Sequence, residues 1–335
     1  MDYDNCLRQI QDFLENSPLV ILGSGASAAY GLPLMYQISD EIKKHSDKFS
    51  TDEYAELCNN LDNTNLEAAI DETSLCEVSL EVLRNIIWDY INKKDLEFSQ
   101  SLSDDSSNFA IADLLGTLVS SASNTTTVVT TNYDRLAEYA ADLIGTTTVT
   151  GFEGNLIRYF ELPTTTIKNR RIKTRERIVN VWKVHGSLDW FLDKNSNIVS
   201  YPLPTNIPDG HTPLIIPPGK GKYSVTHHEP YRDIIKQADD AFSKAGSYLC
   251  IGYGFNDDHL QPWLIREIKN GKPIVVLCRT ATDACKKNVI SSDVKKYVVV
   301  ERSTDSKTLV TGNGYSEVFD GDFWELSNFI KTIWR

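Results

Sequence analysis

The sequence has few cysteines, and none of them is spaced as metal or redox motifs require. The six are Cys6, Cys58, Cys76, Cys250, Cys278 and Cys285, and no two form a C-x-x-C pair. Zinc ribbons and thioredoxin-type redox sites depend on such pairs, so both kinds of site are excluded. Cys250 and Cys278 lie inside apolar, strand-like runs, which favours a role as small core residues.

Positive charge is also scarce. The formal net charge is −12, with 34 Lys and Arg against 46 Asp and Glu. Nucleic-acid surfaces need clustered basic side chains that release counterions from phosphates, so we expect no direct binding of nucleic acid. The one basic cluster, residues 168–175, lies between strand-like segments. We interpret it as a solvated hairpin tip, with a phosphate or partner contact as the alternative.

Long apolar runs are missing as well. No stretch approaches the roughly 20 apolar residues of a membrane-spanning helix. Residues 1–16 contain acidic side chains and no apolar segment of the kind found in signal peptides. We therefore expect a cytoplasmic protein with reduced cysteines and no membrane contact. Hydrophobic residues make up 41% of the chain and charged residues 24%, which is typical of a globular fold with a buried core.

Strand-like and helical segments alternate along much of the chain. Short apolar or β-branched runs predict buried strands at 19–22, 127–130, 178–184, 248–251, 274–277 and 297–300. Amphipathic spacing predicts helices between them, among others at 135–144, 231–244 and 259–269. This alternation implies right-handed crossovers and a parallel sheet. The predicted fold class is α/β, with a doubly wound, mostly parallel Rossmann-like sheet.

The same patterns predict three parts. Residues 1–45 and 122–335 form the Rossmann-like domain. Residues 46–121 show helical periodicity and no buried strand, which indicates a helical insert. Residues 152–225 alternate short β-like runs with turns and prolines, so we expect a small irregular or β subdomain within the main domain, without zinc.

Four polar or glycine-rich clusters directly follow predicted strands. They are residues 23–27, 132–134, 185–187 and 252–258. In open α/β sheets, ligands bind beyond the carboxyl ends of the strands. A parallel sheet would bring the four clusters to one edge, and this convergence predicts the functional site.

Two of the clusters are glycine turns. Gly23-Ser24-Gly25 follows the first strand, and Gly252-Tyr253-Gly254 repeats the pattern after a later one. Glycine lets backbone N–H groups approach a phosphate closely, although tight strand-to-helix turns also use glycine for structural reasons. The first turn is not a full G-x-G-x-x-G fingerprint, because position 28 is Ala. Two such turns suit a dinucleotide better than a mononucleotide.

The other two clusters carry candidate catalytic groups. Asn132 can donate to and accept from one ligand, while the alternative role is a helix N-cap. We assign the cap to Asp134, which directly precedes a predicted helix. His185 is suited to taking a proton near neutral pH, and a structural histidine is the alternative. The run at 257–259 contains Asp and His, which are common metal ligands. Adjacent side chains at a helix start point in different directions, so we expect no metal site there.

The four clusters resemble the motifs of sirtuins. GSGASAAYGLP from Gly23 resembles the sirtuin Gly-Ala-Gly-x-Ser followed by Gly-Ile-Pro. TTNYD at 130–134 resembles Thr-Gln-Asn-x-Asp, VHGS at 184–187 resembles the His-Gly pair, and GYGF at 252–255 takes the place of a Gly-Thr-Ser-Leu turn. The resemblance implies NAD+ as substrate.

The resemblance also implies roles for individual residues. Gly23, Ser24, Gly25 and Ser27 would line the pyrophosphate and ribose, and Asn132 and Asp134 would lie near the nicotinamide ribose. His185 would be the general base. Gly252, Tyr253 and Gly254 would form the turn on the adenine side.

Departures from the sirtuin pattern favour one branch of the family. The zinc-binding C-x-x-C pairs are missing, Thr131 stands in place of Gln, and Leu34-Met35-Tyr36 stand where sirtuins have Asp-Phe-Arg. In these respects the chain resembles the sirtuin-like NADases of bacterial anti-phage systems, which implies hydrolysis of NAD+ gated by homo-oligomerisation or by a HerA-like ATPase partner. Two alternatives are an NAD-dependent deacylase or ADP-ribosyltransferase, and a non-catalytic sensor of NAD or ADP-ribose.

Overall fold

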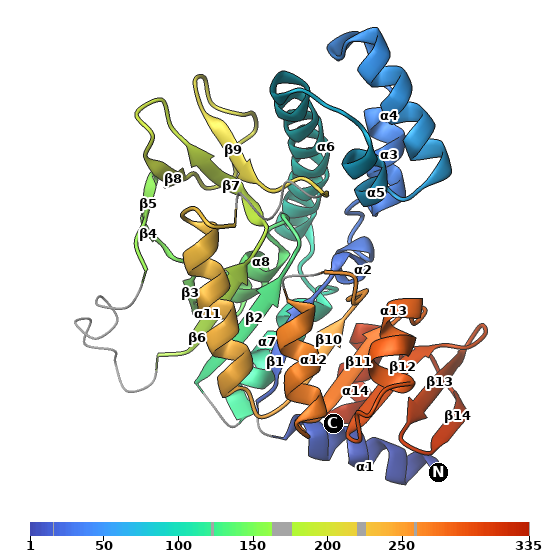
Figure 1. Cartoon of the computed structure of the whole chain (residues 1–335). Coiled ribbons are helices and arrows are strands. Elements are labelled where there is room, and N and C mark those ends of the chain that lie inside the picture. The colour runs from blue at the N-terminus through green and yellow to red at the C-terminus, as the bar shows by residue number, and fades with distance from the viewer. Residues whose placement is uncertain (16, 122–123, 163–175, 220–225, 258–259, 335) are drawn as a thin grey trace.

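Figure 1 shows the computed structural model of the chain, which describes residues 1–15, 17–121, 124–162, 176–219, 226–257 and 260–334. The basic cluster at 168–175 lies outside these residues, and so do Asp258 and His259 of the run considered for a metal.

A nine-stranded sheet forms the centre of the described part of the chain, and its seven strands from β12 to β3 are parallel. The strands are, in spatial order, β14 (Tyr315–Asp320), β13 (Lys307–Gly312), β12 (Tyr297–Arg302), β11 (Ile274–Cys278), β10 (Tyr248–Ile251), β1 (Leu19–Leu22), β2 (Thr125–Thr130), β6 (Ile178–Lys183) and β3 (Thr147–Val149). From the central pair β1 and β10 the chain winds outward in opposite directions. This confirms the predicted doubly wound, mostly parallel sheet.

The sheet has a hydrophobic core on each face, because successive side chains of a strand point to opposite sides. Val20 and Leu22 join one core, and Leu19 and Ile21 join the other. The first core packs against α1 (Tyr3–Leu14), α7 (Ala110–Ser121), α8 (Leu136–Leu143) and α14 (Leu326–Ile333). The second packs against α11 (Tyr231–Lys244), α12 (Gln261–Lys269) and α13 (Asp283–Cys285), and Figure 1 shows α11 and α12 side by side. Every residue of β1 is buried, as a strand covered on both faces requires.

Residues 46–121, predicted as an insert, are largely helical. The helices between β1 and β2 are α2 (Ser24–Ala28), α3 (Met35–Ile42), α4 (Thr51–Asn63), α5 (Leu66–Glu72), α6 (Glu77–Asp104) and α7. Figure 1 shows α3, α4 and α5 grouped together, away from the sheet, with the long α6 leading back toward it. The last helix, α7, packs against β2, α8 and α14, so this part of the segment belongs to the helical layer of the sheet.

A second, antiparallel sheet lies within 152–225. Its order is β4 (Phe152–Gly154), β5 (Arg158–Phe160), β8 (Ile198–Ser200), β7 (Gly186–Leu192) and β9 (Thr212–Ile215). The rings of Phe152 and Trp190 pack with centroids 4.8 Å apart. Because β6 belongs to the large sheet and β7 to the small one, the intervening His185 lies at the junction of the two sheets.

Two regions of the structure differ from the sequence predictions. Helix α2 begins at Ser24, directly after β1, where the sequence suggests a loop, and the helix expected from Pro33 begins at Met35. Strands β13 and β14 form an antiparallel hairpin that the strand prediction did not include. Asn313 and Gly314 connect these strands, and Asn-Gly between strand-like runs is a strong hairpin signal.

No helix of the described residues is long and apolar enough to cross a membrane.

The two glycine turns pack directly against each other. The N–H of Gly25 donates to the carbonyl of Gly252 at 3.0 Å. A Cβ atom on Gly252 would lie 2.1 Å from the backbone nitrogen of Ala26, and Gly252 has a φ of +57°. Both observations exclude a side chain at this position. The glycine at 252 is therefore required by the close approach of two chain segments, whatever ligand lies above them.

Replacing Gly252 with Ala should lower the free energy of unfolding by about 2–4 kcal/mol, because the new methyl group forces the turns after β1 and β10 apart. Gly271→Ala is the matched control, since Gly271 has a φ of +98° but no neighbour within 4 Å of an added Cβ. It should cost only the backbone strain of about 1–2 kcal/mol. Urea unfolding measures both, and equal losses would contradict the packing argument.

A buried ion pair ties helix α6 to the start of α8. The Arg135 side chain binds Asp95 through Nε at 2.8 Å and Nη2 at 2.6 Å, and its backbone N–H also donates to Asp95. Asn92 accepts from Arg135 at 2.8 Å, and the Tyr139 hydroxyl donates to Asp95. Asp95 is fully buried. The chain that follows β2 is thus attached to α6 by several charged hydrogen bonds.

Asp95→Ala should destabilise the protein by about 3–5 kcal/mol, because it leaves the Arg135 guanidinium buried without its counterion. The neighbouring Lys94→Ala removes an ion pair with Glu97 whose two side chains are 35% and 49% exposed. That control should cost less than about 1 kcal/mol. Chemical denaturation of both variants tests the difference, and similar values for both would show that the Asp95 pair is not a structural anchor.

Candidate functional site

A cavity of about 460 Å³ lies beyond the carboxyl ends of β1, β2, β6 and β10. Eight of the predicted site residues line it, namely Gly23, Ser24, Ser27, Asn132, Asp134, His185, Tyr253 and Gly254. Its volume lies within the range of about 300–1,000 Å³ that is usual for small-molecule sites. The structure therefore brings all four sequence clusters to one cavity.

The remaining two predicted residues, Gly25 and Gly252, line a second cavity of about 810 Å³. Arg279 and Arg302, which follow or end the next two strands, contribute to its wall together with Trp324. The same two glycine turns therefore line both cavities, the first through Gly23, Ser24, Tyr253 and Gly254 and the second through Gly25 and Gly252.

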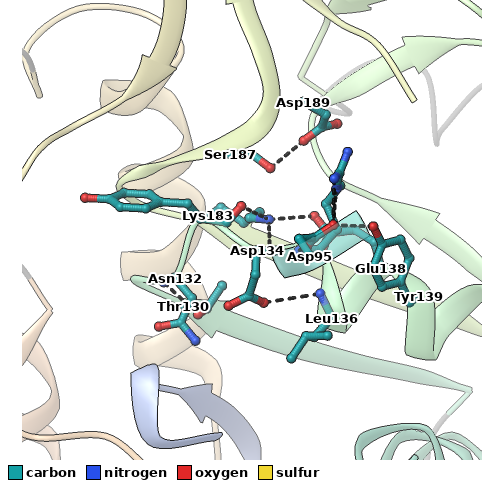
Figure 2. Close-up of polar contacts among 12 residues, drawn as sticks. Asp95, Thr130, Asn132, Asp134, Leu136, Glu138, Tyr139, Lys183, Ser187 and Asp189 are labelled. Carbon is teal, nitrogen blue, oxygen red and sulfur yellow. Dashed lines mark hydrogen bonds and ion pairs between the residues drawn. The ribbon is translucent and has the colours of Figure 1, made fainter. Parts of the chain in front are cut away.

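Asn132 is held by the turn after β1. Its side-chain Nδ2 donates to the carbonyl of Gly23 at 3.0 Å and to Ser27 Oγ at 2.9 Å. Its backbone N–H donates to Thr130 Oγ1 at 3.0 Å (Figure 2). Both amide hydrogens are engaged within the protein, so the side-chain oxygen is the atom that can accept from a ligand.

Asp134 joins the site to the start of α8. Its Oδ2 accepts from the hydroxyl of Ser27 at 2.7 Å. Its Oδ1 accepts from the backbone N–H of Leu136 at 3.2 Å (Figure 2). The second bond satisfies an N–H at the helix start, which is the capping role predicted for Asp134. Burial raises the pKa of Asp134, and the charge of Lys183 opposes this rise. The charge of Lys183 and the hydrogen bonds from Ser27 and Leu136 therefore favour the ionised form of this carboxyl group against the effect of burial.

Lys183 is a site-associated residue that sequence reasoning missed. It is completely buried, and its Nζ donates to the carbonyls of Tyr133 and Asp134 and to Glu138 Oε1 (Figure 2). Burial raises the pKa of Glu138 to about 7, with Lys183 acting in the opposite direction. A lysine inside the otherwise apolar end of strand β6 was the available signal, since buried lysines need partners.

His185 pairs with a carboxylate from the β10 turn. Its Nε2 lies 3.0 Å from Asp257 Oδ2, and the two side chains are 7% and 9% exposed. Asp257 Oδ1 accepts from the N–H of Leu260 at 2.9 Å, which fixes the carboxylate just before α12. The sequence placed Asp257 in the 252–258 cluster and in the run considered for a metal, but gave no sign of its pairing with His185. A carboxylate beside an imidazole holds the ring in one orientation.

Gly186 sets the position of His185 in the chain. It has a φ of +88°, and a Cβ there would lie 1.9 Å from the carbonyl oxygen of Leu214 on β9. The carbonyl of His185 accepts from Ile216 N at 2.9 Å, immediately after β9. The His-Gly pair is thus built into the meeting point of β6, β7 and β9, and any larger residue at 186 would displace β9.

The helical segment between β1 and β2 also lines the cavity. Asn65, Leu66 and Glu67 at the start of α5 contribute to its wall, as do Leu32, Pro33 and Met35 before and within α3. Tyr36, the next residue after Met35, is 62% exposed. The sequence predicts residues 46–121 only as a helical insert, and the place of α5 in the cavity wall comes from long-range packing.

Chemically, the cavity combines an amide oxygen, an imidazole–carboxylate pair and a glycine turn at a helix start. This set can bind a polar ligand, orient a hydroxyl group or water, and accept a proton. Among the described residues, no group of three His, Cys, Asp or Glu side chains is arranged to hold a metal ion.

Residues 126–281 match the family model described as SIR2-like domain. The matched stretch includes Asn132, Asp134, His185 and the Gly252–Gly254 turn, and it begins after the Gly23 turn. The comparison with curated proteins found no match.

The chain is also similar to solved structures of Sir2 proteins. For a Sir2 homologue in complex with NAD, the sequence identity is 14% and the TM-score 0.46, covering 89% of this chain and 88% of that one. For a structure on the mechanism and regulation of Sir2 enzymes, the sequence identity is 14% and the TM-score 0.43, covering 84% of this chain and 89% of that one. For a structure on the basis of sirtuin substrate affinity, the sequence identity is 13% and the TM-score 0.46, covering 84% of this chain and 90% of that one.

Proposed function

We propose that this protein is an NAD+ hydrolase, which cleaves the bond between nicotinamide and ribose and releases nicotinamide and ADP-ribose. The observation that carries the proposal is that Asn132 and His185 line one cavity together with the glycine turn after β1. The resemblance of these residues to sirtuin motifs, and the SIR2-like match over residues 126–281, support the same substrate.

The pair of cavities favours a dinucleotide. Both cavities are lined by the same two glycine turns, and the N–H groups at the start of α2 suit a pyrophosphate. We place the nicotinamide ribose in the cavity with Asn132 and His185. The adenosine half would occupy the cavity lined by Gly25, Gly252 and Arg279.

The proposed reaction replaces the nicotinamide by water. The bond from ribose C1′ to the nicotinamide nitrogen breaks, its electron pair leaves with nicotinamide, and the ribose gains oxocarbenium character. The side-chain oxygen of Asn132 orients the attacking water or a ribose hydroxyl. His185 takes the proton as the new C–O bond forms, and Asp257 stabilises the resulting imidazolium.

Water is the favoured acceptor because the helical segment contributes to the wall of the cavity. Asn65, Leu66 and Glu67 line the same cavity as His185. An acyl-lysine or another protein acceptor would need a groove beside His185, and these residues take up wall space in that cavity. This supports hydrolysis over deacylation or ADP-ribosyl transfer.

We also propose a biological role, based on the resemblance alone. An NADase that is always active would kill its own cell, so its activity must be gated. The chain would serve as an NAD-depleting effector of anti-phage defence, activated by self-assembly or by a partner such as a HerA-like ATPase.

Purified wild-type protein, alone and with its genomic-neighbour partner, should convert NAD+ to nicotinamide and ADP-ribose without any acyl-lysine substrate. His185→Ala should lower the rate by about 10²–10⁴-fold, because it removes the general base. Asn132→Ala should also be nearly inactive. Chromatography with product identification measures both.

The controls are His211→Ala and Asn180→Ala, which remove the same residue types outside the cavity lining. Both should retain wild-type rates. If the wild-type protein binds NAD+ but leaves it intact in every condition, the hydrolase proposal fails and a sensor of NAD or ADP-ribose replaces it.

A further inference from the structure

Lys183 makes three contacts with its single ammonium group. Nζ lies 3.1 Å from the carbonyl oxygen of Tyr133, donates to the carbonyl of Asp134, and lies 3.1 Å from Glu138 Oε1. A lysine ammonium has three N–H donors, so these contacts account for all of them. The side chain has no exposed surface and is not part of the cavity wall. Lys183 therefore acts on protein groups and not on a ligand.

Two of these contacts hold the turn that carries Asn132. The carbonyls of Tyr133 and Asp134 belong to consecutive peptide groups directly after Asn132, and both point at the same cation (Figure 2). The N–H of Leu188 also donates to the Tyr133 carbonyl at 3.1 Å. Rotation of either peptide group would break a charged hydrogen bond. The clamp therefore fixes the backbone from which the Asn132 and Asp134 side chains extend.

The charge of Lys183 acts on Asp134 as well. Five influences meet at this carboxyl group: burial and Asp95 of α6 raise its pKa, while Lys183 of β6, the Ser27 hydroxyl of α2 and the backbone N–H of Leu136 lower it. As a carboxylate, Asp134 accepts from Ser27, and Ser27 in turn accepts from the amide of Asn132. A hydrogen-bonded chain thus runs from the Asp134 carboxyl group through Ser27 to Asn132, while Lys183 binds the backbone carbonyl of Asp134.

We propose that Lys183 is the positioning residue of this site: it clamps the turn of residues 132–134 and places its positive charge beside Asp134, so that Ser27 and Asn132 are held for catalysis. The catalytic part of this statement rests on the proposed hydrolase function. Packing alone does not explain the residue, because burying a charged pair is often no more stabilising than an apolar pair of similar volume.

The chain offers a matched control. Lys272 also binds two consecutive carbonyls, those of Phe242 at 3.2 Å and Ser243 at 2.7 Å, and a glutamate, Glu267, at 2.9 Å. It lines neither of the two cavities. Lys272→Met therefore removes the same kind of clamp from a place with no proposed catalytic role.

The first test compares Lys183→Met and Lys272→Met for NAD+ cleavage. Lys183→Met should lower kcat by about 10²-fold, as misplacement of catalytic groups by about 1 Å does, while KM changes less than about threefold. Lys272→Met should keep kcat within about twofold of wild type. Should Lys183→Met fail to fold, the double variant with Glu138→Gln removes both charges of the buried pair and replaces it in the comparison. A kcat within threefold of wild type for the folded variant overturns the proposal.

The second test needs no substrate. The ¹³C signal of the Asp134 side-chain carboxyl, assigned with Asp134→Asn, is titrated in wild type and in both lysine variants. Loss of Lys183 removes the nearby positive charge, so the Asp134 midpoint should rise, and protonated Asp134 should persist to higher pH. In an active enzyme the acidic limb of the kcat–pH profile should move in the same direction.

An Asp134 midpoint that is unchanged in Lys183→Met overturns the electrostatic part of the proposal. A midpoint that shifts equally in Lys272→Met overturns its specificity. Because this titration does not depend on turnover, it decides the role of Lys183 even if the wild-type protein leaves NAD+ intact, an outcome that would refute only the hydrolase function.

Discussion

The parallel pairing of β10, β1, β2 and β6 is the constraint on which the site depends. In the observed register, Ile251, Leu22, Thr130 and Lys183 form one row across the sheet, and each is the last residue of its strand. The residues that follow therefore leave the sheet at the same level. A register change in any of these strands would move its turn away from the others, so the cavity exists only while the four strands stay aligned.

Around this row of strand ends, several buried groups fix the turns that follow the strands. Lys183 holds the turn after β2, Asp257 holds His185 from the β10 turn, and Gly252 allows that turn to touch the one after β1. Helix α6 adds contacts from outside the sheet, through Asp95 to Arg135 and through Trp88 Nε1 to the carbonyl of Leu188 at 2.9 Å. Helix α6 therefore contacts both the segment after Asn132 and the segment after His185. A displacement of α6 would change the positions of both segments.

The sequence predicted those features that depend on local pattern. Strands β1 and β10 and helix α11 have the predicted bounds, because apolar runs and helical periodicity are local signals. The convergence of four clusters also followed, since parallel strands share one carboxyl edge. Other features depend on contacts between distant residues. The burial of Lys183, the pairing of Asp257 with His185 and the entry of α5 into the cavity wall leave little trace in a local window. The β13–β14 hairpin could have been predicted from the sequence, because its Asn313-Gly314 turn is a local hairpin signal.

The central claim is that the nicotinamide ribose of NAD+ lies between Asn132 and His185, with the adenosine half beyond the paired glycine turns. The most direct measurement is a crystal structure of the His185→Ala protein soaked with NAD+, in which slow turnover preserves the ligand. The account predicts the nicotinamide ribose within hydrogen-bond distance of the Asn132 side-chain oxygen, and the adenosine in the cavity lined by Gly252 and Arg279. A nucleotide bound in the opposite orientation, or outside these two cavities, would contradict it.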